Sequence, residues 1–131
     1  MATVHRAELE VRGYELDSFG HVNHSVYLNY LEHARWRMLY EAGITLEKLQ
    51  QWKRWPVIAK IEVEYLKPTF LGERLIVHSH VTSQRKTSFI VEQTITRDEQ
   101  LVLKARIHAV MVNEKGRPAE MPSEVSQLGR E

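Results

Sequence analysis

Cysteine is absent from the 131-residue chain. Its absence excludes disulfides, thiolate metal ligands and a cysteine nucleophile, and it fits a reducing compartment. No run approaches the roughly 20 apolar residues of a membrane-spanning helix, and the opening MATVHRAELE lacks the apolar stretch of a signal peptide. We therefore expect a cytoplasmic protein without membrane insertion.

An excess of one charge is also missing, because 18 Lys and Arg stand against 17 Asp and Glu, for a net charge of +1. No global basic field therefore favours a nucleic-acid or membrane partner, and any recognition of anions must be local. Repeats and Gly-, Pro- or Ser-rich linkers are lacking too, so residues 1–131 are expected to form a single domain with its own core.

Hydrophobic periodicity predicts one long helix over residues 24–42. Apolar side chains recur there at three- and four-residue steps, namely Tyr27, Leu31, Ala34, Met38 and Ala42. Asn23 is the expected N-cap, and Gly43 lies where a glycine commonly follows a helix. Thr45 is expected to cap a short second helix.

The remaining segments are typical of strands. Residues 4–14 predict a first strand, and 57–66 predict a second, with Val57, Ala59, Ile61, Val63 and Tyr65 on one face. Turn residues divide 74–82, 88–96 and 101–112 into three more, before an irregular tail. This order predicts an α+β fold in which a curved antiparallel sheet covers the helix.

Such a sheet has free edges. A long exposed edge strand presents unpaired backbone groups that can associate with another chain. Pairing two copies edge to edge would cover them, so a homodimer is expected in preference to a monomer.

Residues able to perform chemistry gather in the pattern Asp17-x-x-Gly20-His21-x-Asn23-His24. A carboxylate in a loop just before a helix lies near the unpaired N–H groups of the helix start, where the dipole favours negative charge. A thioester carbonyl held on the N–H groups near His24 would be polarised, and Asp17 could attack it or activate a water. Gly20 would allow an unusual turn or close approach of a substrate. Taken alone, such a carboxylate more often caps a loop than performs chemistry.

The same region resembles the N-terminal signature of the 4-hydroxybenzoyl-CoA thioesterase family, in the residues VRGYELDSFGHVNHSVYLNYLEHARW. Within that family it is most similar to bacterial long-chain acyl-CoA thioesterases of fatty-acid degradation, through the Val-Arg-Gly-Tyr-x-Leu-Asp opening and the Glu-x-Ala-Arg-Trp helix segment. The resemblance continues more loosely through Tyr65, Lys67-Pro68, Gly72, the Lys86-x-Ser88 turn and the final strand.

The resemblance implies a hotdog fold, in which a five-stranded antiparallel sheet wraps a long central helix. It implies a homodimer or homotetramer with the active site at the subunit interface. The implied reaction is the hydrolysis of a medium- or long-chain acyl-CoA to the free acid and CoA, with no cofactor.

The family's catalytic carboxylate falls on Asp17, and the amide that polarises the carbonyl falls on His24. Many members have two asparagines where this chain has Asn23-His24. A role of the backbone amide alone tolerates that change, whereas a side-chain role in acyl selection would be altered.

Other polar residues of the segment have structural interpretations. His21 is expected to fix the loop by hydrogen bonds rather than to act as a base. Glu32 and Arg35 are three residues apart on the helix, which predicts an ion pair that orients the helix or bridges subunits. Tyr27 and Tyr30 are expected to line the core or the acyl pocket.

Seven histidines raise the question of a metal site. His21 with His24, and His78 with His80, form pairs, whereas zinc needs three or four ligands, and no His-Glu-x-x-His motif occurs. We therefore expect no metal.

The phosphates of coenzyme A require cations. The turn that contains Arg85, Lys86 and Thr87 offers two basic groups and a hydroxyl between two predicted strands. A solvated hairpin explains the same residues, but the family resemblance favours a CoA site there, with Lys60 as a weaker candidate.

Three alternatives stay open beside the acyl-CoA thioesterase. A hotdog dehydratase typically carries Asp-x-Asn-Pro-x-His, and Asp17-Ser-Phe-Gly-His21 lacks both the Asn-Pro and the spacing. A non-catalytic acyl- or lipid-binding module would keep the pocket without turnover, and the presence of Asp17 argues against it. A thioesterase acting on acyl-carrier protein is the third. Chain length, dimer or tetramer, and attack or water activation by Asp17 are not decided by the sequence.

Overall fold

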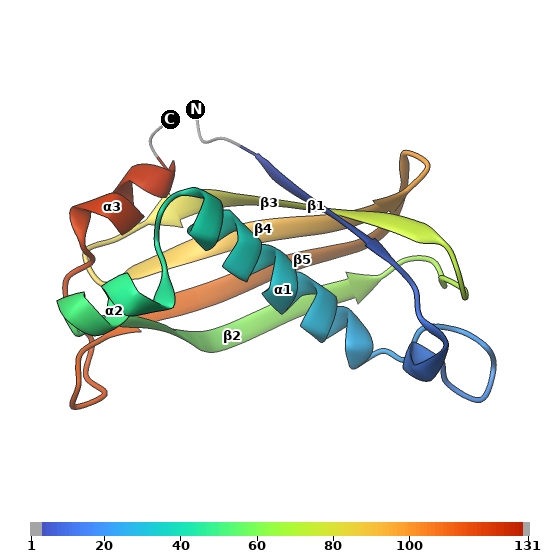
Figure 1. Cartoon of the computed structure of the whole chain (residues 1–131), viewed down its shortest axis with the longest axis horizontal. Helices are drawn as coiled ribbons and strands as arrows, with labels where there is room; N and C mark the ends of the chain where they lie inside the picture. The colour runs from blue at the N-terminus through green and yellow to red at the C-terminus, as the bar shows by residue number, and fades with distance from the viewer. Residues whose placement is uncertain (1–3, 130–131) are drawn as a thin grey trace.

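One curved sheet surrounds a long helix in the computed structural model, which describes residues 4–129 (Figure 1). Its five antiparallel strands follow the order β1-β3-β4-β5-β2. The strands are β1 (His5–Glu10), β2 (Trp55–Tyr65), β3 (Arg74–Gln84), β4 (Ser88–Arg97) and β5 (Gln100–Val112). The helices are α1 (Val26–Glu41), α2 (Leu46–Trp52) and α3 (Ser123–Ser126), with short 3-10 turns η1 (Gly13–Glu15) and η2 (Gln127–Gly129). The predicted α+β arrangement is confirmed.

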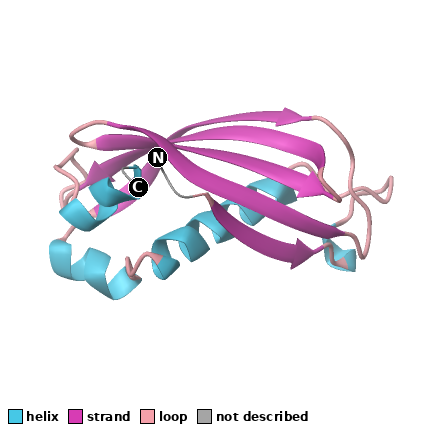
Figure 2. Cartoon of the chain, turned by 90° about the horizontal axis from the view of Figure 1, so that it is seen from above, coloured by secondary structure: helices cyan, strands magenta, loops and turns pink. Residues whose placement is uncertain are grey.

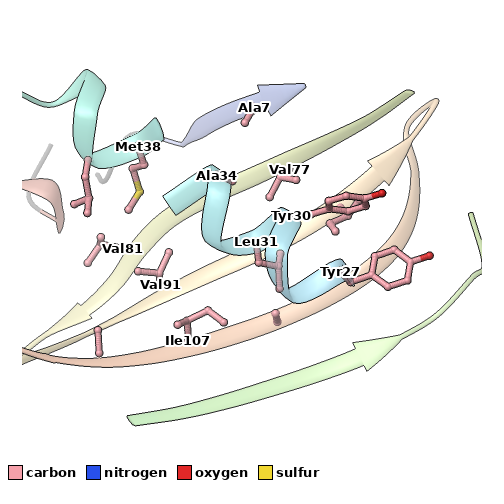
Figure 3. Close-up of a cluster of buried hydrophobic side chains, with 14 of the residues drawn as sticks. Ala7, Tyr27, Tyr30, Leu31, Ala34, Met38, Val77, Val81, Val91 and Ile107 are labelled. Carbon is pink, nitrogen blue, oxygen red and sulfur yellow. The ribbon is translucent and has the colours of Figure 1, made fainter. Parts of the chain in front are cut away.

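The core lies between α1 and the concave face of the sheet, as the view from above makes clear (Figure 2). One face of α1 is buried, through Tyr27, Tyr30, Leu31, Ala34, Met38 and Leu39. Alternate residues of the central strands meet this face, including Val77, Val91 and Ile107 (Figure 3). The predicted buried face is therefore confirmed, except that Ala42 lies just beyond the helix and is exposed.

Local signals fix the ends of the helices. Gly43 has φ +83°, which favours glycine, and Ile44 N donates to Leu39 O at 2.8 Å, so the predicted C-terminal glycine is confirmed. The hydroxyl of Thr45 accepts from Lys48 N at 3.2 Å, as expected for a cap. In the described part of the chain, no helix is long and apolar enough to cross a bilayer.

The predicted N-cap was placed too early. The helix begins at Val26, so its N-cap is Ser25, and Asn23 lies two residues further upstream. Asn23 still accepts from Ser25 N, at 3.0 Å, but it stabilises an additional turn before the helix. The loop before α1 is therefore longer and more structured than a simple cap.

The strand β2 departs from strict alternation. Ile58 pairs with Ala109 but Lys60 pairs with His108, so Ala59 is an extra residue in a β-bulge. Because the bulge reverses the alternation, Val57 and Ile61 point to opposite faces. The prediction that they share a face was wrong.

The first strand and the tail both differ from the prediction. The first strand ends at Glu10 and gives way to η1, instead of continuing to residue 14. The tail is not irregular throughout, because α3 places Val125 in the core with 1% exposure and Met121 N donates to Lys86 O at 3.1 Å. Burial of one apolar side chain anchors this tail.

Candidate active site

A tight turn presents Asp17 in the loop 16–25 between η1 and α1. Its Oδ1 accepts from Phe19 N at 2.8 Å and from His21 N at 3.1 Å. Asp17 N donates to His21 O at 2.7 Å, and Gly20 completes the turn with φ +80°, a region that favours glycine. Within residues 4–129, Oδ2 has no hydrogen-bond donor. One carboxylate oxygen therefore holds the loop and the other is free.

The amide of His24 differs from those around it. Asn23 N donates to Glu15 O at 2.9 Å, Ser25 N to the Asn23 side chain at 3.0 Å, and Val26 N to Asn23 O at 2.9 Å. No residue in the described chain accepts from His24 N. This N–H is a free donor just before α1.

A pocket of about 280 Å³ joins these two groups at the N-terminal end of α1. It is lined by Asp17, His21, Val22, His24, Tyr27, Tyr65, Leu66, Lys67 and Pro68. The structure thus brings four predicted site residues together, from a loop and from the first turn of α1. The sequence analysis did not include Tyr65 and Lys67 among the site residues, although both belong to its looser match to the family.

A second loop, residues 66–73, forms the opposite wall. Thr69 is fully buried, and its carbonyl accepts from Val22 N at 2.9 Å. Its hydroxyl lies 2.6 Å from the hydroxyl of Tyr27. Burial raises the pKa of the Tyr27 phenol despite the hydrogen bond with Thr69. Tyr27 therefore borders the pocket as predicted, with its hydroxyl already engaged.

Glu15 anchors the start of the Asp17 loop and was missed by the sequence analysis. It is 6% exposed, and Oε1 accepts from Tyr30 at 2.6 Å and from Arg12 N at 2.8 Å. Oε2 forms an ion pair with the Arg12 guanidinium at 2.9 Å. Burial alone would raise the pKa of this carboxyl, but the bonds from Tyr30 and Arg12 outweigh it and hold the pKa below its ordinary value. No local sequence signal marks a buried carboxylate of this kind.

His21 fixes the loop mainly through its backbone. Its N–H donates to Asp17 Oδ1, and its ring packs edge-on against Phe70 with centroids 5.1 Å apart. His21 and Phe70 also form an isolated β-bridge between the two loops. This agrees with the loop-fixing interpretation, through the main chain and packing instead of the imidazole nitrogens.

The expected helix-orienting ion pair does not form. Arg35 donates to Gln93 Oε1 at 2.9 Å, and no Arg35–Glu32 ion pair occurs in the part of the chain that the structure describes. Gln93 is 1% exposed and donates in turn to Leu31 O and to Ser79, at 3.0 and 2.8 Å. Burial lowers the pKa of Arg35. The helix is oriented by this buried amide on β4, so the ion-pair prediction was wrong within one chain.

The turn with Arg85, Lys86 and Thr87 lies far from the pocket in one chain. It follows the 11 residues of β3, which at about 3.3 Å each span roughly 35 Å. Figure 1 shows this turn and the Asp17 loop at opposite ends of the sheet. A single chain therefore does not bring the predicted CoA residues to the predicted catalytic ones.

Known proteins resemble this chain over most of its length. Residues 11–128 match the model of the thioesterase-like superfamily. Acyl-acyl carrier protein thioesterase ATL3 of Arabidopsis thaliana is 30% identical over 127 residues, 95% of this chain and 67% of ATL3, so the chain spans only about two thirds of that relative. Long-chain acyl-CoA thioesterase FadM of Escherichia coli is 32% identical over 116 residues, 87% of each chain. A crystal structure of a hypothetical protein from Aquifex aeolicus superposes with a TM-score of 0.88 at 28% identity, over 94% of this chain and 97% of that one.

Proposed function

Because the chain belongs to the thioesterase-like superfamily and is a thioester hydrolase with the hotdog fold, we propose that it hydrolyses an acyl-CoA to the free acid and CoA. The observation that carries the proposal is that Asp17, whose Oδ2 has no donor, and His24, whose amide has no acceptor in the described chain, line the same pocket. The 32% identity with FadM, which is named for long-chain acyl-CoA, supports this class of substrate. Residence in the cytoplasm, and one domain over residues 1–131, stay predictions.

In the proposed reaction the thioester carbonyl oxygen accepts from His24 N–H, and Asp17 Oδ2 acts on the carbonyl carbon. If Asp17 attacks, a mixed anhydride forms, the C–S bond breaks and the thiolate takes a proton from solvent before water cleaves the anhydride. If Asp17 acts as a base, it takes a proton from a water whose oxygen adds to the carbon, and the thiol leaves with that proton. In a well-studied protease, removal of one such oxyanion donor raises the activation barrier by about 3–4 kcal/mol.

A single turnover in water labelled with heavy oxygen tests the covalent route. Label in the Asp17 carboxylate would show attack by Asp17, because water that opens the anhydride at the aspartyl carbonyl leaves its oxygen there. Water activation leaves Asp17 unlabelled and puts the label in the fatty acid alone. Peptide mass measurement after one turnover gives the answer.

A second, largely apolar cavity would suit a medium- or long-chain acyl group. Further along α1 lies a cavity of about 160 Å³, between the helix and β2. Its apolar lining includes Trp36, Met38, Leu39, Pro56, Ile58 and Phe89. Apolar surface of this kind favours burial of methylene groups.

The edge strand β2 supports a homodimer. It pairs only with β5, and Ile58, Ile61 and Tyr65 are 39%, 41% and 48% exposed on it. Residues directly opposite in a sheet share a face, so two copies of β2 related by a two-fold axis must pair about a residue. Pairing about Ile61 places Lys60 opposite Glu62 of the partner subunit, twice, and opposes no like charges. Pairing about Lys60 or Glu62 instead sets that residue against its own copy, although the Glu62 register also places Lys60 opposite Glu64.

Antiparallel pairing would also complete the site. It turns the partner so that the β3–β4 turn of one chain lies at the same end of the joint sheet as Asp17 of the other. Arg85, Lys86 and Thr87 of the partner subunit would then face the outer end of the pocket. We propose these residues for the CoA phosphates on that basis, with the active site between subunits.

A panel of acyl-CoA chain lengths, read by thiol release with wild-type and Asp17→Asn protein, tests the function. Asparagine keeps an oxygen for Phe19 N and His21 N, so the loop is retained while the carboxylate is lost. We expect kcat to fall at least about 100-fold, with acyl-CoA binding retained. The matched control is Asp98→Asn, at a loop position with φ 49° that asparagine accepts. Undiminished turnover by Asp17→Asn would overturn the role of Asp17.

The same thiol-release assay, run also with acyl-carrier-protein substrates, tests the alternative functions. Faster thiol release from acyl-carrier protein than from acyl-CoA would favour the carrier named for ATL3. Binding without thiol release by the wild-type chain would indicate a non-catalytic acyl-binding module.

A further inference from the structure

Three tyrosines form a row beside the pocket. The rings of Tyr65 and Tyr27 lie 5.7 Å apart, and those of Tyr27 and Tyr30 lie 5.9 Å apart at 87°. Figure 3 shows the latter two projecting side by side from the start of α1. Each hydroxyl bonds a different segment of the site: Tyr30 donates to Glu15 before the Asp17 loop, Tyr27 bonds Thr69 in the opposite wall, and Tyr65 donates to the carbonyl of His24 at 2.9 Å.

Tyr65 differs from the other two in its surroundings. Tyr27 and Tyr30 are 4% and 2% exposed, so their hydroxyls need protein partners, whereas Tyr65 is 48% exposed and could bond water. It stands at the last position of the edge strand β2 and lines the pocket. Its bond to His24 links residues 41 apart in sequence. This bond therefore is not a requirement of burial.

The bonded carbonyl belongs to the residue whose N–H is free. The two groups share the Cα of His24, so a bond that holds the carbonyl restricts rotation about that residue. The side chains of His24 and Ser25 are exposed. Ser25 is held by Asn23 Oδ1, which accepts from its N–H and its hydroxyl, whereas the bond from Tyr65 is the one hydrogen bond of His24 within the described residues. A donor aimed before the reaction requires no reorganisation when charge develops on the substrate oxygen.

We propose that Tyr65 is a positioning residue for thioester hydrolysis, whose hydroxyl holds the His24 amide aimed into the pocket. The inference rests on the proposed function, because it assigns the His24 amide to the oxyanion. Tyr65 acts through His24 on the chemical step, so its effect falls on kcat more than on KM.

The test compares Tyr65→Phe with Tyr40→Phe. The first removes one hydroxyl and keeps the ring that packs on Tyr27, and the second removes the hydroxyl of a 63% exposed tyrosine at the far end of α1. We expect kcat of Tyr65→Phe to fall about 5- to 10-fold, as for one neutral hydrogen bond, with KM within about twofold. Tyr40→Phe keeps both constants.

A spectroscopic readout follows the amide itself. Addition of a non-hydrolysable ketone analogue of acyl-CoA to wild-type protein should move the nitrogen–proton NMR signal of His24 downfield, as its N–H meets the carbonyl. In Tyr65→Phe this signal should shift less and broaden. The thermal unfolding midpoint should match that of Tyr40→Phe.

Several results would overturn the inference. An unchanged kcat, a rise in KM alone, or loss of the folded state in Tyr65→Phe would each make Tyr65 a binding or structural residue. A wild-type chain that releases no thiol from acyl-CoA or acyl-carrier protein sinks the proposed function instead. In that case the NMR measurement still tests the positioning role. A His24 amide signal that shifts equally in Tyr65→Phe and Tyr40→Phe on addition of the analogue would overturn it.

Discussion

At the scale of single residues, the candidate site combines a side-chain carboxylate with a main-chain amide. Asp17 uses one oxygen to hold Phe19 N and His21 N and keeps the other free. His24 contributes an amide without an acceptor in the described chain, while its side chain is exposed. In the proposed mechanism this main-chain amide acts alone, so a histidine side chain can follow Asn23.

Substitutions of His24 can separate these two parts. His24→Asn keeps the amide, so we expect kcat within about threefold of wild type. His24→Pro removes the N–H, and because position 24 precedes the N-cap Ser25 the change breaks no hydrogen bond within the helix. We expect kcat to fall about 100- to 1000-fold with the unfolding midpoint little changed, by analogy with loss of an oxyanion donor. Steady-state thiol release measures both, and equal losses in both variants would assign the role to the imidazole.

Glu15 should make stability depend on pH in a definite direction. Its folded pKa lies below the ordinary 4.5, so its contribution is complete above that pH and is lost as pH falls through the lower folded value. We expect Glu15→Gln to lower the free energy of unfolding by about 1–3 kcal/mol at pH 7, and the difference from wild type to shrink as the pH falls below 4.5. Urea unfolding across this range checks it.

The control for this measurement is Glu120→Gln, at an exposed carboxylate that takes part in no ion pair in the described chain. It should match wild type at every pH. A constant difference for Glu15→Gln from pH 7 to pH 3 would contradict the ionised state of Glu15 in the folded protein.

The residues that sequence reasoning could predict are those with local signals. Asp17, Gly20 and His24 lie within eight positions in a recognisable pattern before a helix, and the structure places Asp17 and Gly20 in one turn and Asp17 and His24 in one pocket. Thr69 and Tyr65 join the site through hydrogen bonds to residues that are 42 and 41 positions away in the sequence. Such contacts depend on how the strands assemble, so no window of sequence contains them.

At the scale of elements, hydrophobic periodicity predicted the regular helix and strands and missed the β-bulge that interrupts β2. The buried face of α1 and the three strands from β3 to β5 follow regular spacings and were predicted within a few residues. The bulge at Ala59 adds one residue without any marker such as glycine or proline. It places Ile58 and Ile61 on the same concave face, next to α1, where strict alternation would have separated them.

The same strand connects fold and site. Its regular part from Lys60 to Tyr65 ends where Tyr65 reaches the carbonyl of His24. Its other edge has no partner strand among residues 4–129. Pairing of this edge with another strand would therefore also restrict Tyr65, the residue that holds the proposed oxyanion donor.

At the scale of the whole molecule, one chain holds its proposed site residues at two ends of the sheet, the Asp17 loop at one and the β3–β4 turn at the other (Figure 1). In the proposed dimer, a two-fold axis through β2 would bring these ends of different chains together. The charges on β2 give this arrangement a test of register, because Lys60 would face Glu62 of the partner subunit on both sides of the axis.

Charge reversal on β2 should therefore weaken the dimer in a way that a second reversal repairs. Lys60→Glu opposes two carboxylates twice, and Glu62→Lys opposes two ammonium groups twice. With about 0.2–1 kcal/mol for each cross-strand pair, we expect each single change to raise the dimer dissociation constant about tenfold. The double change K60E with E62K restores opposite charges and should return it to within about threefold of wild type.

Sedimentation equilibrium at low salt measures these constants, since salt screens exposed pairs. Lys104→Glu is the matched control, a reversal on β5 of a lysine that pairs with Glu64 away from the free edge. It should leave the dimer intact. A double change as weak as the single ones would exclude the Ile61-centred register, and a monomeric wild type would exclude the homodimer, leaving Arg85 and Lys86 too far from Asp17 to serve one substrate.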